Sequence, residues 1–261
     1  PTETRLKLRK SKSDTLPPIT PSLKVEDAYK AYLDTVVYNT STIISEDITP
    51  IFIDLVNAES ARIEYKANLE QVNSVFNDSV NFTPEEQLEN QVNVLKDKLD
   101  ESIASVKDSF ENDLQKYITN ATYFVGGVDT YTQNQLYKQI SDKYTVSRVK
   151  FLSMDEIGVP FEKAVNTNVK LIKSVSTEYA DKVQKAVLDN FSKVAKKGDI
   201  SLIQQIMDER EGVTLRRAEV IARDQSAKTT EAFNAARYKN YGINTAIWAV
   251  ADLSDRTRPS H

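Results

Sequence analysis

The side chains best suited to acid–base or metal chemistry are scarce in this chain. His261 is the single histidine among 261 residues, and cysteine is absent. A lone histidine forms a Ser-His-Asp relay only where the fold places a nucleophile and an orienting acid beside it. A zinc site needs further nitrogen or sulfur ligands, and the lack of cysteine excludes disulfides and thiolate metal sites in these residues. We interpret His261 as a structural residue and predict no metal, no cofactor and no enzymatic activity.

A second set of reactive side chains lies on one predicted helix, where Arg223 and Asp224 are followed by Glu231. The two carboxylates could form a catalytic acid pair. The alternative is an ordinary ion pair between Asp224 and Lys228, which are four residues apart and therefore share one side of a helix. We favour the ion pair. The Gly126-Gly127 stretch lacks the Lys-Ser/Thr of a phosphate-binding loop, so no nucleotide site is predicted.

Residues 1–22 are predicted to form a basic arm. Five cations lie between positions 5 and 12, and three prolines follow in LPPITP (16–21). Proline blocks helix formation, and such a polar segment is expected to be disordered until a partner binds it. The cations could contact acidic protein or the phosphates of a nucleic acid. We favour protein, because no aromatic side chain lies between them. The candidate partner-binding residues are Arg5, Lys7, Arg9, Lys10 and Lys12.

The net charge of −4 is unevenly distributed. Residues 1–24 carry a net charge of +4, residues 25–114 carry −13, and the remainder carries +5. This asymmetry is typical of separate surfaces for separate partners, or of complementary packing between subunits. It is equally typical of a solvated acidic face joined to a basic tail. No apolar run approaches the roughly 20 residues of a membrane span, and the charged N-terminus lacks the apolar stretch of a secretory signal.

The predicted fold class is mainly α, with a long-helix N-terminal bundle and a small α+β C-terminal module. Residues 23–158 form the predicted helical region, because apolar residues recur there at spacings of three and four. Thr83-Pro84 has the composition of a capped helix start. The apolar stripe behind it predicts one helix over about 84–118, packed within the chain or as a coiled coil between subunits. The stripe consists of Leu88, Val92, Leu95, Leu99, Ile103, Val106, Phe110 and Leu114.

The remainder of this region is predicted to be interrupted. Gly126-Gly127 is expected to break the chain, a short helix is expected over 131–144, and a strand is expected over 146–152.

The predicted C-terminal module covers residues 159–261. Ser176 is expected to cap a helix that ends at Gly198, with two lysines in its last turn. Asp199 is expected to cap a short helix after it, and a third helix is expected from Thr214 to Gly242. The strand-like segment 243–250 would then place Trp248 in the core. The two lysines are Lys196 and Lys197.

The order and spacing of these C-terminal residues resemble the C-terminal module of the phage Mu F-like minor head proteins, also called head morphogenesis proteins. The likeness covers about 160–261. It begins with Arg-Ala-Glu at 217–219 and Ile-Ala-Arg-Asp-Gln at 221–225, and it closes on Asp-Arg-Thr-Arg-Pro-Ser-His at 255–261. The residues that carry the motif are Arg217, Arg223, Asp224, Gln225, Asn234, Arg237, Gly242, Trp248, Asp255, Arg256, Arg258 and His261.

The resemblance implies a minor capsid or head morphogenesis protein of a tailed phage. Such a protein binds the portal vertex or inner capsid during head assembly and DNA packaging or ejection. The implied partners are the portal protein, the major capsid protein and a scaffold. Several copies would lie at the portal vertex of the virion, after assembly in the host cytoplasm. The rival reading is a nucleic-acid-binding head protein whose arm contacts packaged DNA, and an enzyme is a third reading, because some relatives carry toxin-like or transferase domains.

The resemblance also bears on the C-terminus. Some relatives have Cys-Pro-x-Cys where this chain has Arg258 and His261. A guanidinium is no zinc ligand, so the metal site of those relatives is not predicted here. Relatives continue with Leu-Asp-Gly, which implies that the module is truncated at His261.

Overall fold

The computed structural model describes residues 16–73, 84–143 and 154–240. Within these ranges the chain is helical apart from short connections, and it contains no strand. The mainly α fold class is therefore confirmed. The strands predicted at 146–152 and 243–250 lie outside the described residues. The elements are α1 (Leu23–Ile43), the π-helical turn η1 (Ile44–Ile48), α2 (Thr49–Asn73), α3 (Pro84–Asn112), α4 (Leu114–Lys143), α5 (Met154–Lys197) and α6 (Ser201–Asn240).

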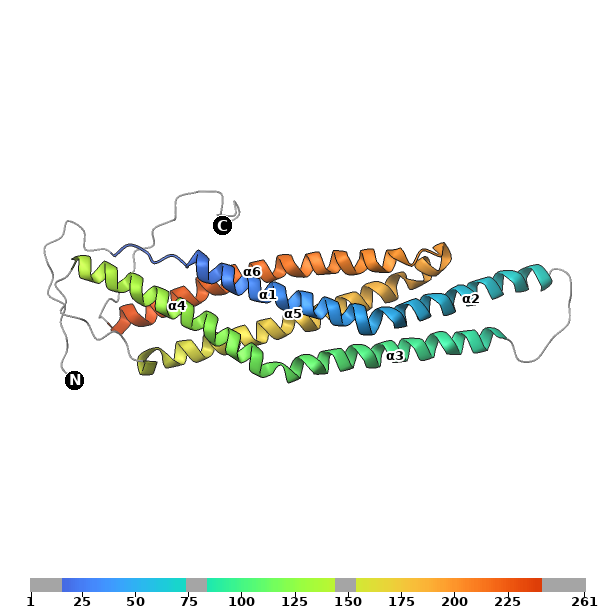
Figure 1. Cartoon of the computed structure of the whole chain (residues 1–261), viewed down its shortest axis with the longest axis horizontal. Helices are drawn as coiled ribbons and strands as arrows, with labels where there is room; N and C mark the ends of the chain where they lie inside the picture. Colours follow the sequence, from blue (N-terminus) through green and yellow to red (C-terminus); the bar gives the residue numbers. More distant parts are fainter. Residues whose placement is uncertain (1–15, 74–83, 144–153, 241–261) are drawn as a thin grey trace.

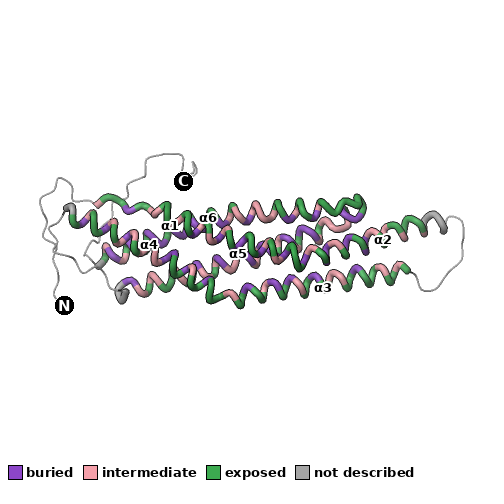
Figure 2. The backbone as a smooth tube through the Cα atoms, in the orientation of Figure 1, coloured by how far each residue is buried: buried purple, intermediate pink, exposed green. Residues whose placement is uncertain are grey.

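The helices form an elongated bundle built on the antiparallel pair α5 and α6 (Figure 1). These helices have 44 and 40 residues, so each spans roughly 60 Å at 1.5 Å per residue. α1 and α4 pack against one half of the pair, and α2 and α3 pack against the other half. Buried positions line the inside of the bundle over most of its length, whereas residues 60–69 of α2 and 84–91 of α3, at the far end, include no buried residue (Figure 2). The described part of the predicted C-terminal module thus packs directly on the predicted N-terminal bundle.

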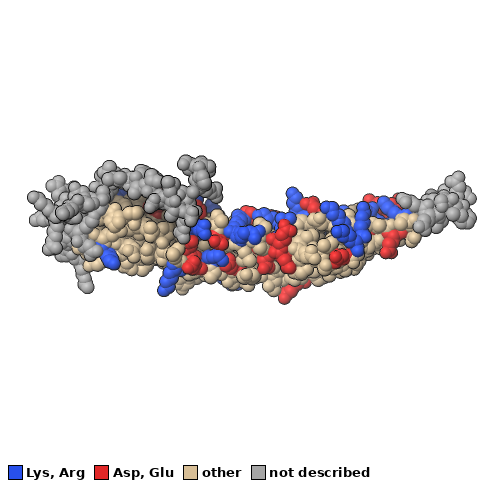
Figure 3. Space-filling model, turned by 90° about the horizontal axis from the view of Figure 1, so that it is seen from above, with Lys and Arg blue, Asp and Glu red and all other residues tan. Residues whose placement is uncertain are grey.

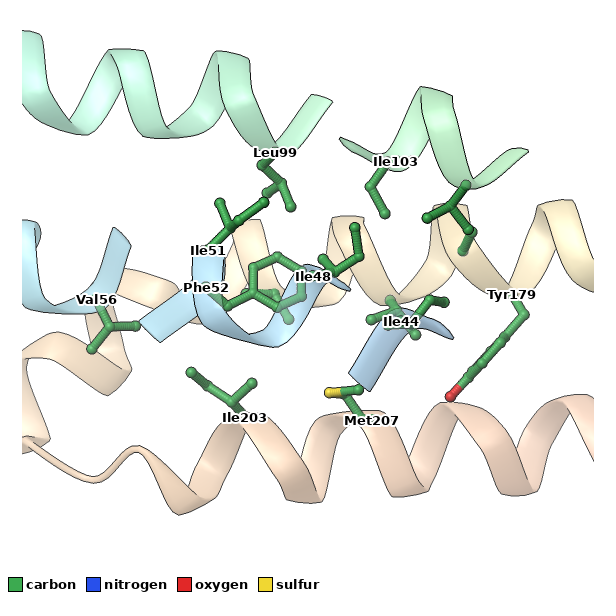
Figure 4. Packing of buried hydrophobic residues seen from close by; sticks show 14 of the residues in the cluster. Ile44, Ile48, Ile51, Phe52, Val56, Leu99, Ile103, Tyr179, Ile203 and Met207 are labelled. Atoms are coloured by element: carbon green, nitrogen blue, oxygen red, sulfur yellow. The ribbon is translucent and has the colours of Figure 1, made fainter. Parts of the chain in front are cut away.

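Two apolar cores follow from this arrangement. The α1–α4 core joins α1 and α4 to α5 and α6, and the α2–α3 core joins η1, α2 and α3 to the same pair. Figure 4 shows the α2–α3 core, in which side chains from η1, α2, α3, α5 and α6 converge. No helix in the described ranges is long and apolar enough to cross a membrane. The α2–α3 core includes Ile44, Ile48, Phe52, Leu99, Ile103, Val183, Ile203 and Met207. The α1–α4 core includes Tyr29, Leu33, Val37, Ala121, Phe124, Ile172, Ala222 and Phe233.

The helix expected from Leu23 is confirmed as α1. Ser22 precedes it with an extended backbone, and its Oγ accepts a hydrogen bond from the Val25 backbone N–H at 3.4 Å. This is the geometry of an N-cap. Tyr29, Leu33 and Val36 of the predicted stripe are buried.

α1 continues into α2 through η1, and Pro50 explains this π turn. Proline has no N–H, and its ring clashes with the carbonyl four residues before it in an α-helix. Here the Thr49 N–H bonds to the Ile44 oxygen, five residues back, as in a π-helix. The wider turn accommodates Pro50 while the chain stays helical. Ile44 and Ile48 remain fully buried, facing Tyr179 of α5 and Met207 of α6 (Figure 4).

The single helix predicted over 84–118 is wrong, because α3 ends at Asn112 and α4 begins at Leu114. The Asp113 carbonyl accepts the backbone N–H groups of Lys116 and Tyr117, at 2.9 and 3.1 Å, and so starts the new helix. The interruption has a packing reason: Phe110 belongs to the α2–α3 core, whereas Tyr117 belongs to the α1–α4 core. Leu114, the last residue of the predicted stripe, is 43% exposed. Thr83, the predicted cap, lies outside the described residues.

The break predicted at Gly126-Gly127 is also wrong, since both glycines lie inside α4. A Cβ on Gly127 would meet Val25 Cγ1 at 3.4 Å, so the small residue lets α1 approach closely. A Cβ on Gly126 would meet no atom within 4 Å. Glycine in a helix interior costs about 1 kcal/mol relative to alanine, which packing across the bundle readily overcomes. The short helix predicted over 131–144 is the second half of α4.

α5 starts earlier than predicted. Ser176 caps nothing and is instead buried in the middle of a helix that begins at Met154. Serine is favoured at N-caps, but at this position packing of α5 decides and the helix continues through Ser176. The predicted end is confirmed: Lys196 and Lys197 occupy the last turn, and Gly198 follows with φ 66°. The Gly198 N–H bonds to the Val194 oxygen at 2.9 Å.

Asp199 is confirmed as a cap, because its Oδ1 accepts the Ser201 N–H at 3.1 Å. The helix it caps is the whole of α6, however, so the break expected before Thr214 is absent. Thr214 lies inside α6 and donates its hydroxyl to the Arg210 carbonyl at 2.9 Å. Gly212 lies within the same helix. Packing along α5 outweighs these weak helix formers.

Candidate functional site

The motif residues that the structure describes all lie on α6, in the half that packs on α1, α4 and α5. They are Arg217, Arg223, Asp224, Gln225, Asn234 and Arg237. The arm cations Arg5, Lys7, Arg9, Lys10 and Lys12 lie outside the described residues, as do Gly242, Trp248, Asp255, Arg256, Arg258 and His261. The candidate site is therefore built from α6 and its neighbours.

Arg237 is the centre of a buried polar contact between α6 and α4. Its side chain is fully buried and forms an ion pair with Asp129, whose side chain is 18% exposed. The same guanidinium donates to the Thr132 hydroxyl and, at 3.2 Å, to the Asp129 carbonyl. It also lies over the Phe233 ring, 5.7 Å from the centroid. A buried guanidinium needs such a set of acceptors, because an unpaired buried charge is strongly destabilising.

Arg217 forms a second, more exposed contact, from α6 to α5. Its Nη1 lies 2.5 Å from Glu178 Oε2, and its Nη2 donates to Glu178 Oε1 at 2.8 Å. The same nitrogen donates to Ser174 Oγ at 3.1 Å. Two-nitrogen recognition of a carboxylate fixes orientation as well as distance. Arg217 thus sets the register of α6 against α5.

The predicted ion pair between Asp224 and Lys228 is confirmed at 2.7 Å. The neighbouring Gln225 is buried and donates to Asp224 Oδ2 at 3.0 Å. Arg223 is exposed, and its nitrogens lie 3.1 Å from Glu219 and 3.9 Å from Glu26 of α1. Asp224 therefore has ordinary helix-surface partners in place of a second carboxylate.

A row of buried polar residues continues along α6 toward Arg237. Ser226 and Thr230 are buried, as is Asn234, and one side-chain oxygen of each has no hydrogen-bond partner among the described residues. Asn168 on α5 is buried in the same way. Polar residues at these positions make the α1–α4 core more polar than the α2–α3 core. A buried polar oxygen without a partner is costly, so the polar character of this core adds nothing to stability by itself.

A groove of about 500 Å³ runs along the outside of the site, between α5 and α6. Val159 at its edge is 79% exposed, and Lys163 and Lys228 line it together with Gln225. The groove is open to solvent and lacks the enclosure that buries a small-molecule ligand. Its remaining lining residues are Pro160, Ala164, Thr167, Thr229 and Ala232.

Burial raises the pKa of three tyrosines near the site. Burial raises the pKa of Tyr29, and it raises the pKa of Tyr32 to about 12, with Tyr117 contributing. Burial also raises the pKa of Tyr238. These tyrosines therefore remain protonated at neutral pH. Within the described ranges, no three His, Cys, Asp or Glu side chains are grouped so that they could hold a metal ion.

The sequence does not predict the partners of Arg237, because Asp129 and Thr132 are more than a hundred residues away along the chain. One signal was present. Asp129 is the sole charged residue between Lys116 and Lys138. An isolated charge in such a helix indicates a specific partner of opposite sign.

Comparison with known proteins gives one relative to report. The chain matches no model of a known protein family, and no solved structure matches it. It is 40% identical over 94 residues to a Haemophilus influenzae protein named "Uncharacterized protein". The match covers 36% of this chain and 20% of that relative. The chain thus spans about a fifth of the length of the curated relative it matches.

Proposed function

We propose that the chain is a minor head protein of a tailed phage, which binds the portal vertex or the inner capsid during head assembly. The proposal rests on the resemblance of the segment from Arg217 to His261 to the phage Mu F-like minor head proteins. The observation that best supports it is the use of two motif arginines. Arg217 bonds to Glu178 of α5, and Arg237 bonds to Asp129 of α4.

These contacts give the motif a physical meaning. Each arginine joins α6 to a different helix, so a motif that contains both specifies one arrangement of helices. A motif that holds helices together is expected in a protein that acts by binding, as we propose for this chain. We include in the proposal that residues 241–261 complete a small α+β module, in which segment 243–250 is a strand and Trp248 lies in its core.

The proposed partners are the portal protein, the major capsid protein and a scaffold, with several copies of this chain near the portal vertex in the virion. The elongated bundle suits this role, because a rod of roughly 60 Å helices presents separate surfaces along its length. The arm residues Arg5 to Lys12 are a further proposed contact with an acidic protein surface.

The decisive experiment is retention of the purified chain on portal rings of the phage that encodes it, with major capsid protein as a parallel arm. Retention on either, and recovery of the chain in virions at a fixed ratio to portal, would support the proposal. A folded chain that is retained on neither and is missing from virions contradicts it. His261→Ala should leave retention and infectivity unchanged, whereas deletion of 216–261 removes residues 216–240, well over half of α6, and should abolish both.

The five cations between Arg5 and Lys12 support one alternative, a head protein that contacts packaged DNA. In that case affinity for double-stranded DNA should fall steeply with salt, because each neutralised phosphate releases counterions. Substitution of all five cations by serine would then abolish DNA binding while leaving retention on portal unchanged.

A further inference from the structure

The outward face of α4 carries no charged side chain over most of its length. Lys116 and Lys138 bound it, and the one charged residue between them, Asp129, is paired with the buried Arg237. Figure 3 shows charged side chains from the middle of the molecule to the end formed by α2 and α3, whereas the described surface nearer the other end, which carries α4, is mostly uncharged on the side drawn. The face consists of Thr119, Thr122, Tyr123, Gly126, Thr130 and Asn134, and we name it the α4 face.

Tyr123 protrudes from the α4 face. Its side chain is 77% exposed, whereas the next residue, Phe124, is buried and stacks on Tyr29 of α1 with ring centroids 4.0 Å apart. The helix therefore directs one aromatic ring into the core and the other into solvent. An exposed tyrosine offers large contact area with little loss of conformational freedom on binding, which is why tyrosine is enriched at protein interfaces.

Gly126 forms a gap beside this ring. Positions 123 and 126 are three apart and hence neighbours on one side of the helix. Packing against Val25 accounts for Gly127, but among the described residues a Cβ on Gly126 would meet no atom within 4 Å. Glycine is a poor helix former, and no packing contact with the described residues explains it at this position. A glycine there leaves room for close approach of a second helix from outside.

We infer that the α4 face is a self-association surface, on which α4 of one copy crosses α4 of another. The Tyr123 ring of each copy fills the gap over Gly126 of its partner. A two-fold interface uses the same patch on both subunits, so that patch must supply both the protruding group and the gap that receives it. The α4 face supplies both within one turn of helix.

Charge favours a second copy as the occupant. The chain has a net charge of −4, so two copies carry the same net charge and gain no attraction from it. Two α4 faces can pack on each other without bringing like charges together at the centre of the contact. The bounding cations, Lys116 and Lys138, lie about 15 Å or more along the helix from Gly126. A face without charge gives no attraction to an acidic or basic partner.

The interface between two α4 faces is small, so its affinity is low. A stable interface covers about 800 Å² on each partner, more than one helix face provides. Self-association is therefore weak and depends on concentration, and it becomes effective where another assembly holds copies close together. This inference does not depend on the proposed phage function, because it concerns the isolated chain.

The experiment measures the self-association constant of the full chain by sedimentation equilibrium, from micromolar to about millimolar concentration. Gly126→Ala fills the gap and should weaken association roughly tenfold, a change of one decade in Kd. The same substitution should raise the Tm of the dilute monomer by about 2 °C, because alanine is the better helix former. Opposite signs in the two measurements separate a lost interface from a damaged fold.

Gly212→Ala is the matched control. Gly212 also lies inside a long helix, and a Cβ there would meet only the far end of the Arg216 side chain, at 3.9 Å. It should raise Tm in the same way and leave association unchanged. Tyr123→Ser should weaken association at least as much as Gly126→Ala. Val220→Ser, which removes a 62% exposed side chain from α6, should not.

Cross-linking gives the orientation, since the chain has no cysteine of its own. In an antiparallel two-fold crossing that pairs Tyr123 with Gly126, the axis lies between positions 124 and 125, so Thr119 of one copy faces Thr130 of the other. An equimolar mixture of the Thr119→Cys and Thr130→Cys chains should therefore form a mixed disulfide under mild oxidation. A chain that stays monomeric throughout the concentration range overturns the inference. The inference is also overturned if the chain associates but Gly126→Ala and Tyr123→Ser leave its association constant unchanged. It is overturned as well if the mixed disulfide forms no more often than random pairing of the two chains predicts.

Discussion

Replacing Arg237 by methionine should destabilise the bundle through the charge it leaves behind. Methionine keeps much of the apolar length of arginine, so packing on Phe233 is largely retained. Asp129 then loses its counterion while its side chain stays 18% exposed. Removing one partner of a buried pair costs about 3–5 kcal/mol, and because Asp129 keeps some contact with water we expect about 3 kcal/mol. For a chain of this size that corresponds to a decrease in Tm of roughly 6–12 °C.

The matching substitution on α4 tests the same contact from the other side. Asp129→Leu leaves a guanidinium that is fully buried, so it should cost at least as much as Arg237→Met. The double variant removes both charges and should recover most of the loss, because two apolar side chains of similar volume are often as stable as a buried pair. The Thr132 hydroxyl keeps a hydrogen-bond partner in the double variant, since it also donates to the Val128 carbonyl at 2.9 Å.

The assay is urea unfolding followed by circular dichroism, with the four proteins forming a double-mutant cycle. Arg217→Met is the control, because that arginine and Glu178 are 29% and 44% exposed and such a pair contributes about 1 kcal/mol or less. If the Arg237 and Asp129 substitutions are simply additive, or if Arg217→Met costs as much as Arg237→Met, then the buried pair does not act as described.

Two further predictions concern the α2–α3 core and its rim. Leu99→Asp places a carboxylate at a fully buried position of α3. This substitution should lower the free energy of unfolding by more than about 4 kcal/mol and reduce the helical signal at 222 nm. The control is Lys98→Asp, on the exposed side of the same helix, which should change stability by less than about 1 kcal/mol. Arg62 hydrogen-bonds to Glu59 and holds the pKa of this carboxyl below its ordinary value of 4.5, so the pair stabilises the fold above that pH, and its contribution is lost as pH falls through the lowered pKa. Arg62→Gln should therefore lower stability at pH 7 but flatten the loss of stability below pH 4.5, and an unchanged acid-unfolding curve would count against this account.

The sequence predicts much of this fold because periodicity and caps are local signals. α1, the Gly198 terminus and the Asp199 cap depend on residues within a turn of one another, and all three are confirmed. The prediction fails where packing between helices determines the position of a helix end. The Asp113 interruption arises because neighbouring helices belong to different cores, and the apolar stripe runs through it without a gap in its spacing.

The candidate site shows the same division. The pair between Asp224 and Lys228 is separated by four residues, and spacing alone predicts it. Arg237 was singled out only by resemblance, and its partner on α4 could not be found from sequence because no local rule relates positions 129 and 237. Contacts across such a separation become visible only when the order of helices around the bundle is known.

The π turn at η1 also determines how this chain can change in length. A π turn holds one residue more than the α-helical path it replaces. Deleting exposed Ser45, with Pro50→Ala to permit an ordinary helix, would leave α1 and α2 in their present rotational phase. The same deletion within α2 would rotate everything after it by about 100° and turn its buried face outward. Loss of one residue should therefore be tolerated at η1 more readily than in the helices on either side.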